Sequence, residues 1–95
     1  MKLKKSDEEF LKEEAEKEFN RVNFAIRELK VLNKRAGRVM ELVTSYKEDA
    51  EYFLKNKKYF EAFELCVYIF GLLDTLANLE LIDPGKARKH YKIEQ

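Results

Sequence analysis

The fold is decided by residues 59–81, which read YFEAFELCVYIFGLLDTLANLEL. Apolar residues recur in this stretch at three- and four-residue spacing, the pattern of a helix. They form two rows, each with heptad-like spacing. The rows are Tyr59, Phe63, Cys66, Phe70, Leu73 and Ala77, and Leu65, Tyr68, Leu72, Leu76 and Leu79. Because the rows lie about 140° apart on the helix surface, we expect another helix to pack on each.

Two further amphipathic segments supply those helices. The first is predicted at about residues 7–33, where Ser6 and Glu9 have the spacing of a capping box. The second is predicted at about residues 37–55, and a short polar turn separates it from the third helix, at about residues 58–81. The sequence therefore predicts an all-α fold, a three-helix antiparallel bundle whose third helix is the most buried.

The 95 residues suffice for one hydrophobic core. We expect a single domain at residues 1–85, because the sequence Asp83-Pro84-Gly85 ends the third helix. Residues 86–95 are polar and basic, and we expect them to form a mobile tail.

The charge and the hydrophobic pattern of the chain indicate which kinds of partner to expect. The chain has 19 basic and 18 acidic residues and a formal net charge of +1, so its overall charge does not favour a nucleic acid. No apolar window approaches the length of a membrane span, and we expect a cytoplasmic protein without a membrane partner. The single cysteine, Cys66, is flanked by Leu65 and Val67 and is expected in the core.

One part of the sequence resembles a known family. Residues 46–54 read YKEDAEYFL, and the residues that follow at matching positions are Tyr59, Ala62, Phe63, Tyr68, Gly71, Leu73 and Asp74. This combination, over about residues 39–82, resembles an archaeal family of small helical proteins catalogued as domain of unknown function 357 (DUF357). The resemblance implies a compact helical fold and no established activity. It transfers no catalytic residues, and it leaves out the acidic first helix.

The residue inventory argues against catalysis. The sequence has no His-x-x-His, no pair of cysteines and no Glu-x-x-His, so it offers neither a zinc site nor a di-iron site. The only histidine, His90, lies outside the core segments, which leaves no base beside Cys66. We therefore expect a protein that is not an enzyme and that binds no metal or cofactor.

One side of the predicted third helix carries two residues that are unfavourable there, a glycine in the helix interior and a carboxylate beside apolar residues. Gly71 lies in the helix interior, where glycine costs about 1 kcal/mol relative to alanine, so something is expected to pack closely there. One candidate is the ring of Tyr46. Asp74 borders the apolar rows and needs a hydroxyl or a cation as its partner. Tyr46 and Tyr52 are candidate donors. A structural hydrogen bond is favoured, and a ligand-binding role for Tyr46, Gly71 and Asp74 stays open.

Two surfaces of the first helix are candidates for partners. Phe24 and Val31 lie seven residues apart on the side away from the main apolar row, which suggests a protein partner or a homodimer. A basic stripe could contact phosphates if the helix persists through the connection; it comprises Arg27, Lys30, Lys34 and Arg38. The sequence does not specify a function. The leading hypothesis is a non-enzymatic helical protein-interaction module, and the alternative is an RNA-binding accessory protein that uses the stripe and the tail.

Overall fold

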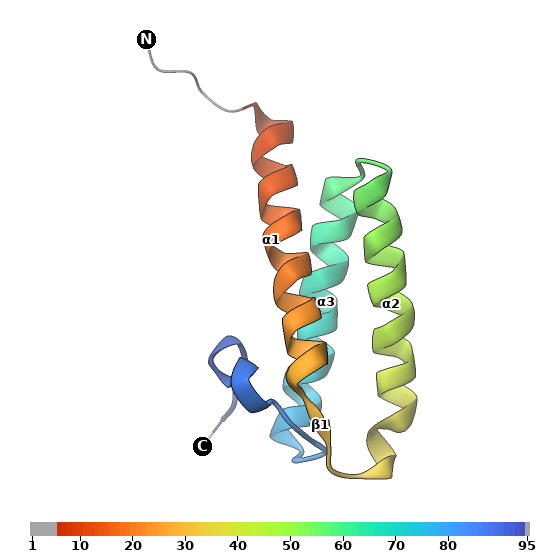
Figure 1. Ribbon diagram of the computed structural model, residues 1–95, viewed down its shortest axis with the longest axis vertical. Coiled ribbons are helices and arrows are strands. Elements are labelled where there is room, and N and C mark those ends of the chain that lie inside the picture. Colours follow the sequence, from red (N-terminus) through yellow and green to blue (C-terminus); the bar gives the residue numbers. More distant parts are fainter. Residues whose placement is uncertain (1–5, 95) are drawn as a thin grey trace.

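The computed structural model describes residues 6–94 and shows three long helices packed side by side (Figure 1). They are α1 (Asp7–Glu28), α2 (Gly37–Lys55) and α3 (Tyr59–Asn78). Consecutive helices run in opposite directions, so α1 and α3 point the same way (Figure 1). The predicted all-α bundle is confirmed, and the bounds of α2 are those expected.

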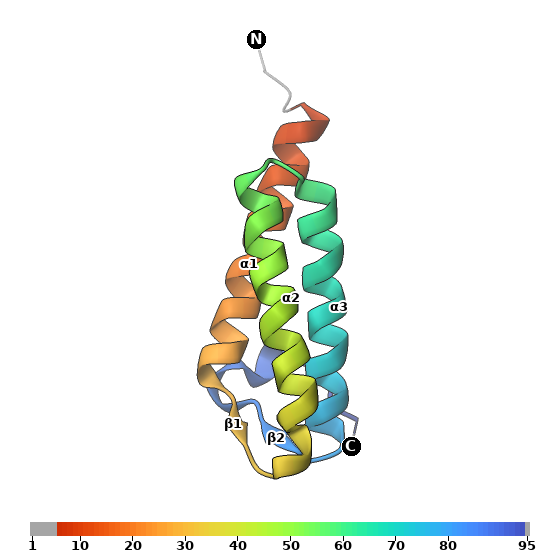
Figure 2. The ribbon, with the colours of Figure 1, turned by 90° about the vertical axis from the view of Figure 1, so that its right-hand side faces the viewer.

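The third helix is the common packing partner of the other two. It packs against both α1 and α2, whereas α1 and α2 contact each other little. Seven residues of α3 are buried, against three of α1 and two of α2. Figure 2 shows α3 along one side of the molecule, with α1 and α2 both on its other side. The predictions that α3 is the most buried helix and that two helices cover it are both confirmed.

The core of α3 lies at the edge of the first predicted row, on the side toward the second row. Ala62, Cys66, Ile69 and Leu73 are fully buried because this edge faces α1 and α2 at once. Neither Ala62 nor Ile69 belongs to a predicted row. The second predicted row is only partly buried, because two of its members, Tyr68 and Leu79, are exposed to solvent.

The start of α1 is capped as the sequence predicts. The Ser6 hydroxyl accepts a hydrogen bond from the Glu9 backbone N–H at 3.1 Å, which satisfies one of the unpaired donors of the first turn. The Glu9 carboxylate accepts a hydrogen bond from the Ser6 hydroxyl at 3.2 Å, a side-chain contact in place of the backbone donor that a complete capping box would give it. The cap therefore fixes the first helical residue at Asp7.

The end of α1 differs from the sequence prediction. The helix stops at Glu28 instead of about residue 33, and β1 (Lys30–Val31) follows. β1 pairs antiparallel with β2 (Ile82–Asp83), Lys30 opposite Asp83 and Val31 opposite Ile82. The paired residues are 53 and 51 positions apart in the sequence, so this pairing leaves no trace in local periodicity. It overrides the helical pattern of residues 29–33.

The same ladder shortens α3. The helix ends at Asn78 and not at about residue 81, because Glu80 has a φ of +60° and turns the chain away from the axis. The Leu81 N–H donates to the Leu76 carbonyl oxygen at 2.9 Å, which closes the helix end. The next residues are thereby aligned as β2.

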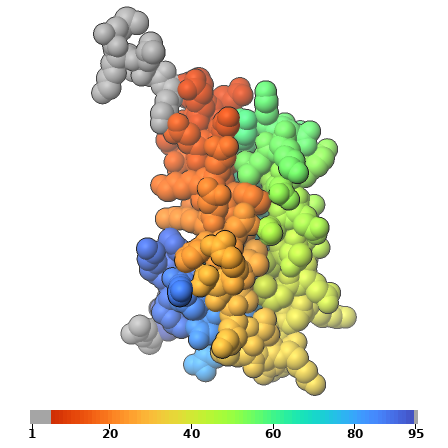
Figure 3. Space-filling model, viewed as in Figure 1, coloured from red at the N-terminus to blue at the C-terminus, as the bar shows by residue number. Residues whose placement is uncertain are grey.

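Residues after Pro84 pack against the bundle. A short 3-10 helix, η2 (Gly85–His90), contacts α1, and a second, η1 (Lys34–Ala36), leads into α2. Ala87 is fully buried and Tyr91 is 8% exposed. Residues 86–94, expected to form a tail, therefore lie against the bundle, and the division of the chain at residue 85 stays a prediction; Gln95 lies outside the described residues. Figure 3 shows this blue segment against the orange half of α1.

Candidate functional site

Asp74 and Asn78 hold the C-terminal segment on α3. The Asp74 carboxylate accepts a hydrogen bond from the Lys92 backbone N–H at 3.1 Å. The Asn78 side-chain amide donates to the Lys92 carbonyl oxygen at 2.8 Å, and its oxygen accepts from the Glu94 backbone N–H at 2.7 Å. These two side chains, one helical turn apart, bind three backbone groups, two of Lys92 and one of Glu94. We call this arrangement the tail clamp.

The clamp corrects the partners expected for Asp74. Its carboxylate binds backbone and not a tyrosine hydroxyl. Tyr46 lies on the α2 side, where its ring meets Tyr68 edge to face with the centroids 5.3 Å apart. A Cβ built on Gly71 meets no atom within 4 Å beyond its own helix backbone, so the expected ring on Gly71 is absent from the described structure. The three residues do not form one site.

Aromatic rings support the same C-terminal segment. Tyr91 packs on Phe70 of α3 at a centroid distance of 6.0 Å, and His90 packs on Phe24 of α1 at 6.1 Å. Burial, together with the charge of Asp74, raises the pKa of the Tyr91 hydroxyl to about 12. The tail is therefore fixed to α1 by ring contacts and to α3 by both rings and hydrogen bonds.

This packing changes the predicted interface of Phe24 and Val31. Phe24 is partly buried, with His90 on its ring and the Arg27 guanidinium 5.4 Å from the ring centre. Val31 is 48% exposed and lies in β1, beyond the end of α1. The two side chains do not continue one helix face, because that face needed α1 to reach residue 33.

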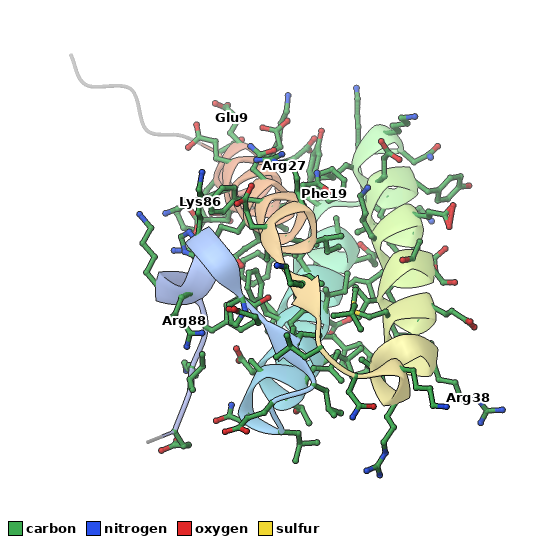
Figure 4. All side chains as sticks on the ribbon, turned by 60° about the horizontal axis from the view of Figure 1, so that its bottom comes forward. Glu9, Phe19, Arg27, Arg38, Lys86 and Arg88 are labelled. Atoms are coloured by element: carbon green, nitrogen blue, oxygen red, sulfur yellow. The ribbon has the colours of Figure 1, made fainter. Side chains whose placement is uncertain are left out.

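The predicted basic stripe is divided among four elements. Arg27 lies on α1, Lys30 in β1 and Lys34 in η1. Arg38 is the second residue of α2, and Figure 4 shows it away from Arg27 and Lys86. The stripe required a helix through residues 29–36, where the structure instead has a strand and a 3-10 turn.

An uncovered surface remains on α3, on the side away from α2. Phe60 and Val67, seven residues apart, are 56% and 49% exposed, and Glu64 and Gly71 are exposed between and beyond them. We call these four residues the outer face of α3. Next to Val67 and Gly71 is a shallow groove of about 320 Å³ whose rim carries charged and polar groups, namely Glu18, Arg21, Asp74, His90 and Lys92.

Among the described residues, the side chains that could ligate a metal are scattered and the one thiol is buried. Among residues 6–94, no group of three or more His, Cys, Asp or Glu side chains could hold a metal ion. Burial raises the pKa of the Cys66 thiol to about 12, which keeps it protonated and unreactive at neutral pH. No helix in the part of the chain that the structure describes is both long and apolar enough to cross a membrane.

Comparison with known families confirms the resemblance. A family model described as "Protein of unknown function (DUF357)" matches residues 11–82. The chain belongs to this family. The match extends through α1, which the sequence resemblance had left out, and it ends at Ile82, before the segment held by the tail clamp. No curated protein and no solved structure matches the chain.

Proposed function

We propose that this DUF357 protein is a non-enzymatic helical module that binds a protein partner through the outer face of α3. One observation carries the proposal: Phe60 and Val67 are about half exposed on one side of the most apolar helix. Single exposed apolar residues are ordinary, but two aligned over two helical turns offer a contact surface. Glu64 and the groove charges supply a polar rim, as protein interfaces commonly have.

The outer face replaces the surface that the sequence suggested. Phe24 is engaged by His90 within the chain, so it has little area left for a partner. The RNA-binding alternative is weaker because its four basic residues lie on separate elements, and no observation favours it. Single-strand binding would also gain from aromatic rings interleaved with the basic residues. The outer face of α3 has one aromatic ring, Phe60, but its charged residue is the acidic Glu64.

Site-directed photo-crosslinking tests the proposal. A photoreactive residue placed at Val67 in the full chain, in cells that naturally make it, should give one discrete protein adduct. The matched control is the same residue at Ser45, which is exposed on α2. We expect the Val67 adduct, identified by mass spectrometry, and none at Ser45. The absence of a protein adduct at Val67, or equal labelling at both positions, would contradict an interaction role for this face.

A further inference from the structure

We infer that Phe70, Asp74 and Asn78 of α3 form a binding site for extended peptide segments, and that the chain's own residues 91–94 are its exchangeable ligand. The site selects an aromatic residue followed, two positions later, by an aliphatic residue. This inference goes beyond the proposed function, because it does not depend on the outer face of α3. It rests on the way in which residues 91–94 are bound.

Three hydrogen bonds recognise the backbone of the bound segment. The chain is extended at Tyr91, with φ −95° and ψ 152°. The Asn78 amide donates to the Lys92 carbonyl oxygen and accepts from the Glu94 N–H, which is the pair of bonds that a parallel neighbouring strand would make. The Asp74 carboxylate accepts from the Lys92 N–H. Because these bonds involve no side chain of the segment, another extended segment can make all three.

Two side chains of the segment give the site its selectivity. Tyr91 is 8% exposed and packs on Phe70, and Ile93 is partly buried against the same core. Lys92 and Glu94, which alternate with them, are exposed. This alternation is the pattern of a strand with one buried face. The site therefore selects apolar side chains at two positions and leaves the residue between them in solvent.

The resident segment does not fit its site completely. The hydroxyl oxygen of Tyr91 is buried and has no hydrogen-bond partner among residues 6–94. A buried hydroxyl without a partner destabilises the bound state, because it has lost its hydrogen bonds to water. Ile93 borders a hollow of about 310 Å³ whose walls include Ala77 and Ile82, which leaves room for a larger apolar side chain. A segment with phenylalanine at the first position should therefore bind more tightly than the resident one.

Only the last residues need to leave the site for exchange. Ala87 is fully buried and Gly85 lies in a turn closed against Glu28, so η2 stays in place. The three hydrogen bonds to the backbone of Lys92 and Glu94 are instead exposed, and such bonds open at a lower free-energy cost than those of the core. A free peptide then competes with a resident segment whose effective concentration, on this short tether, is on the order of millimolar.

Fluorescence anisotropy of a labelled peptide with the full chain tests the inference. The peptide consists of residues 88–94 with Tyr91→Phe, and we expect it to bind the wild type weakly because the resident segment competes. Tyr91→Ala in the chain removes the ring that holds the resident segment, so it should lower the Kd of the peptide by about tenfold or more. Tyr91→Phe in the chain should instead raise this Kd, because the resident segment then binds better.

Matched variants separate this site from unspecific binding. In the Tyr91→Ala chain, the further change Asn78→Ala should weaken peptide binding by about tenfold, since two backbone bonds are lost. Thr75→Ala, which removes only a bond within α3, should leave the Kd unchanged. A peptide with Lys92→Pro, which lacks the N–H that Asp74 binds, should also bind more weakly. Equal binding by the Asn78→Ala and Thr75→Ala chains would overturn the inference.

Amide NMR signals of the wild-type chain give a second measurement that requires no variant. Millimolar peptide with Tyr91→Phe should shift the Lys92 and Glu94 signals to those of a released segment and leave the signals of η2 unchanged. Unchanged Lys92 and Glu94 signals, or no binding by a folded Tyr91→Ala chain, would overturn the inference. Neither result would affect the proposed function, which is tested separately by the Val67 crosslink.

Discussion

Gly85 lies in a closed turn, whereas Gly71 lies on an open helix face. A Cβ on Gly85 would be 2.5 Å from the Glu28 carbonyl oxygen, and the residue has a φ of +62°. Gly71 is in the interior of α3, and a Cβ there would meet no atom within 4 Å beyond the helix backbone. One glycine is required by the packing of the chain, and the other is not. The fold therefore requires a glycine at position 85 and does not require one at position 71.

Gly85→Ala should have the largest effect. The change forces a side chain into the left-handed region and against backbone, so we expect the free energy of unfolding to fall by about 2 kcal/mol or more. Chemical denaturation measures it. Gly37→Ala is the control, because Gly37 has a helical φ of −54° and open space around it. It should be neutral or slightly stabilising, and equal losses for the two variants would mean that the Gly85 turn is not constrained.

Removal of the tail clamp should be the next largest effect. Asn78→Ala deletes the bonds to Lys92 and Glu94, and Asp74→Ala deletes the bond to the Lys92 N–H. Each should lower the free energy of unfolding by about 1 to 2 kcal/mol and speed amide exchange at Lys92 and Glu94. Thr75→Ala, which removes only a bond to the Gly71 carbonyl within α3, is the control. Unchanged stability of Asp74→Ala would favour a ligand-binding role for this carboxylate.

Gly71→Ala should act in the opposite direction. In the monomer it should raise the free energy of unfolding by about 0.5 to 1 kcal/mol, because alanine restricts the unfolded chain and fits the open helix face. Thermal unfolding at submicromolar concentration, where self-association is negligible, measures this gain. A loss of stability would show that Gly71 is packed within the chain and would remove the contrast with Gly85.

Tyr46→Phe should have the smallest effect. The ring contact with Tyr68 is retained, and the hydroxyl is not the partner of Asp74, so the change in stability should stay within about 0.5 kcal/mol. Comparing the stability change with that of Asp74→Ala distinguishes the contacts that α3 makes with α2 from those that it makes with the C-terminal segment. A loss as large as that of Asp74→Ala would mean that the two residues act together after all.

The sequence predicts what depends on local periodicity. The three helices, their order and the central place of α3 follow from apolar spacing, and the start of α1 follows from Ser6 and Glu9. It does not predict β1 or β2, because two-residue strands carry no period and their pairing joins residues 30–31 to 82–83. Because local periodicity does not reveal this pairing, the predicted helices extend beyond the observed ends of α1 and α3.

The candidate site was harder to predict for the same reason. Asp74 was identified from its cost near an apolar row, but its partner is a backbone group 18 residues away, which no side-chain pattern marks. Asn78 could have been found, since it lies one turn from Asp74 on the same face. Tyr91 and Ile93 alternate with charged residues in a segment that was interpreted as solvated, and that alternation was the available signal of a half-buried strand-like tail.

Because Cys66 is buried, the rate at which its thiol is labelled can report the opening of the helical bundle. It is the single thiol of the chain, it lies fully buried near the middle of α3, and its thiolate form is the nucleophile that reacts with labelling reagents. Modification by an uncharged reagent must therefore wait until α1 or α2 separates from α3. The labelling rate at fixed pH then reports how often the bundle opens, and no foreign probe has to be introduced to measure it.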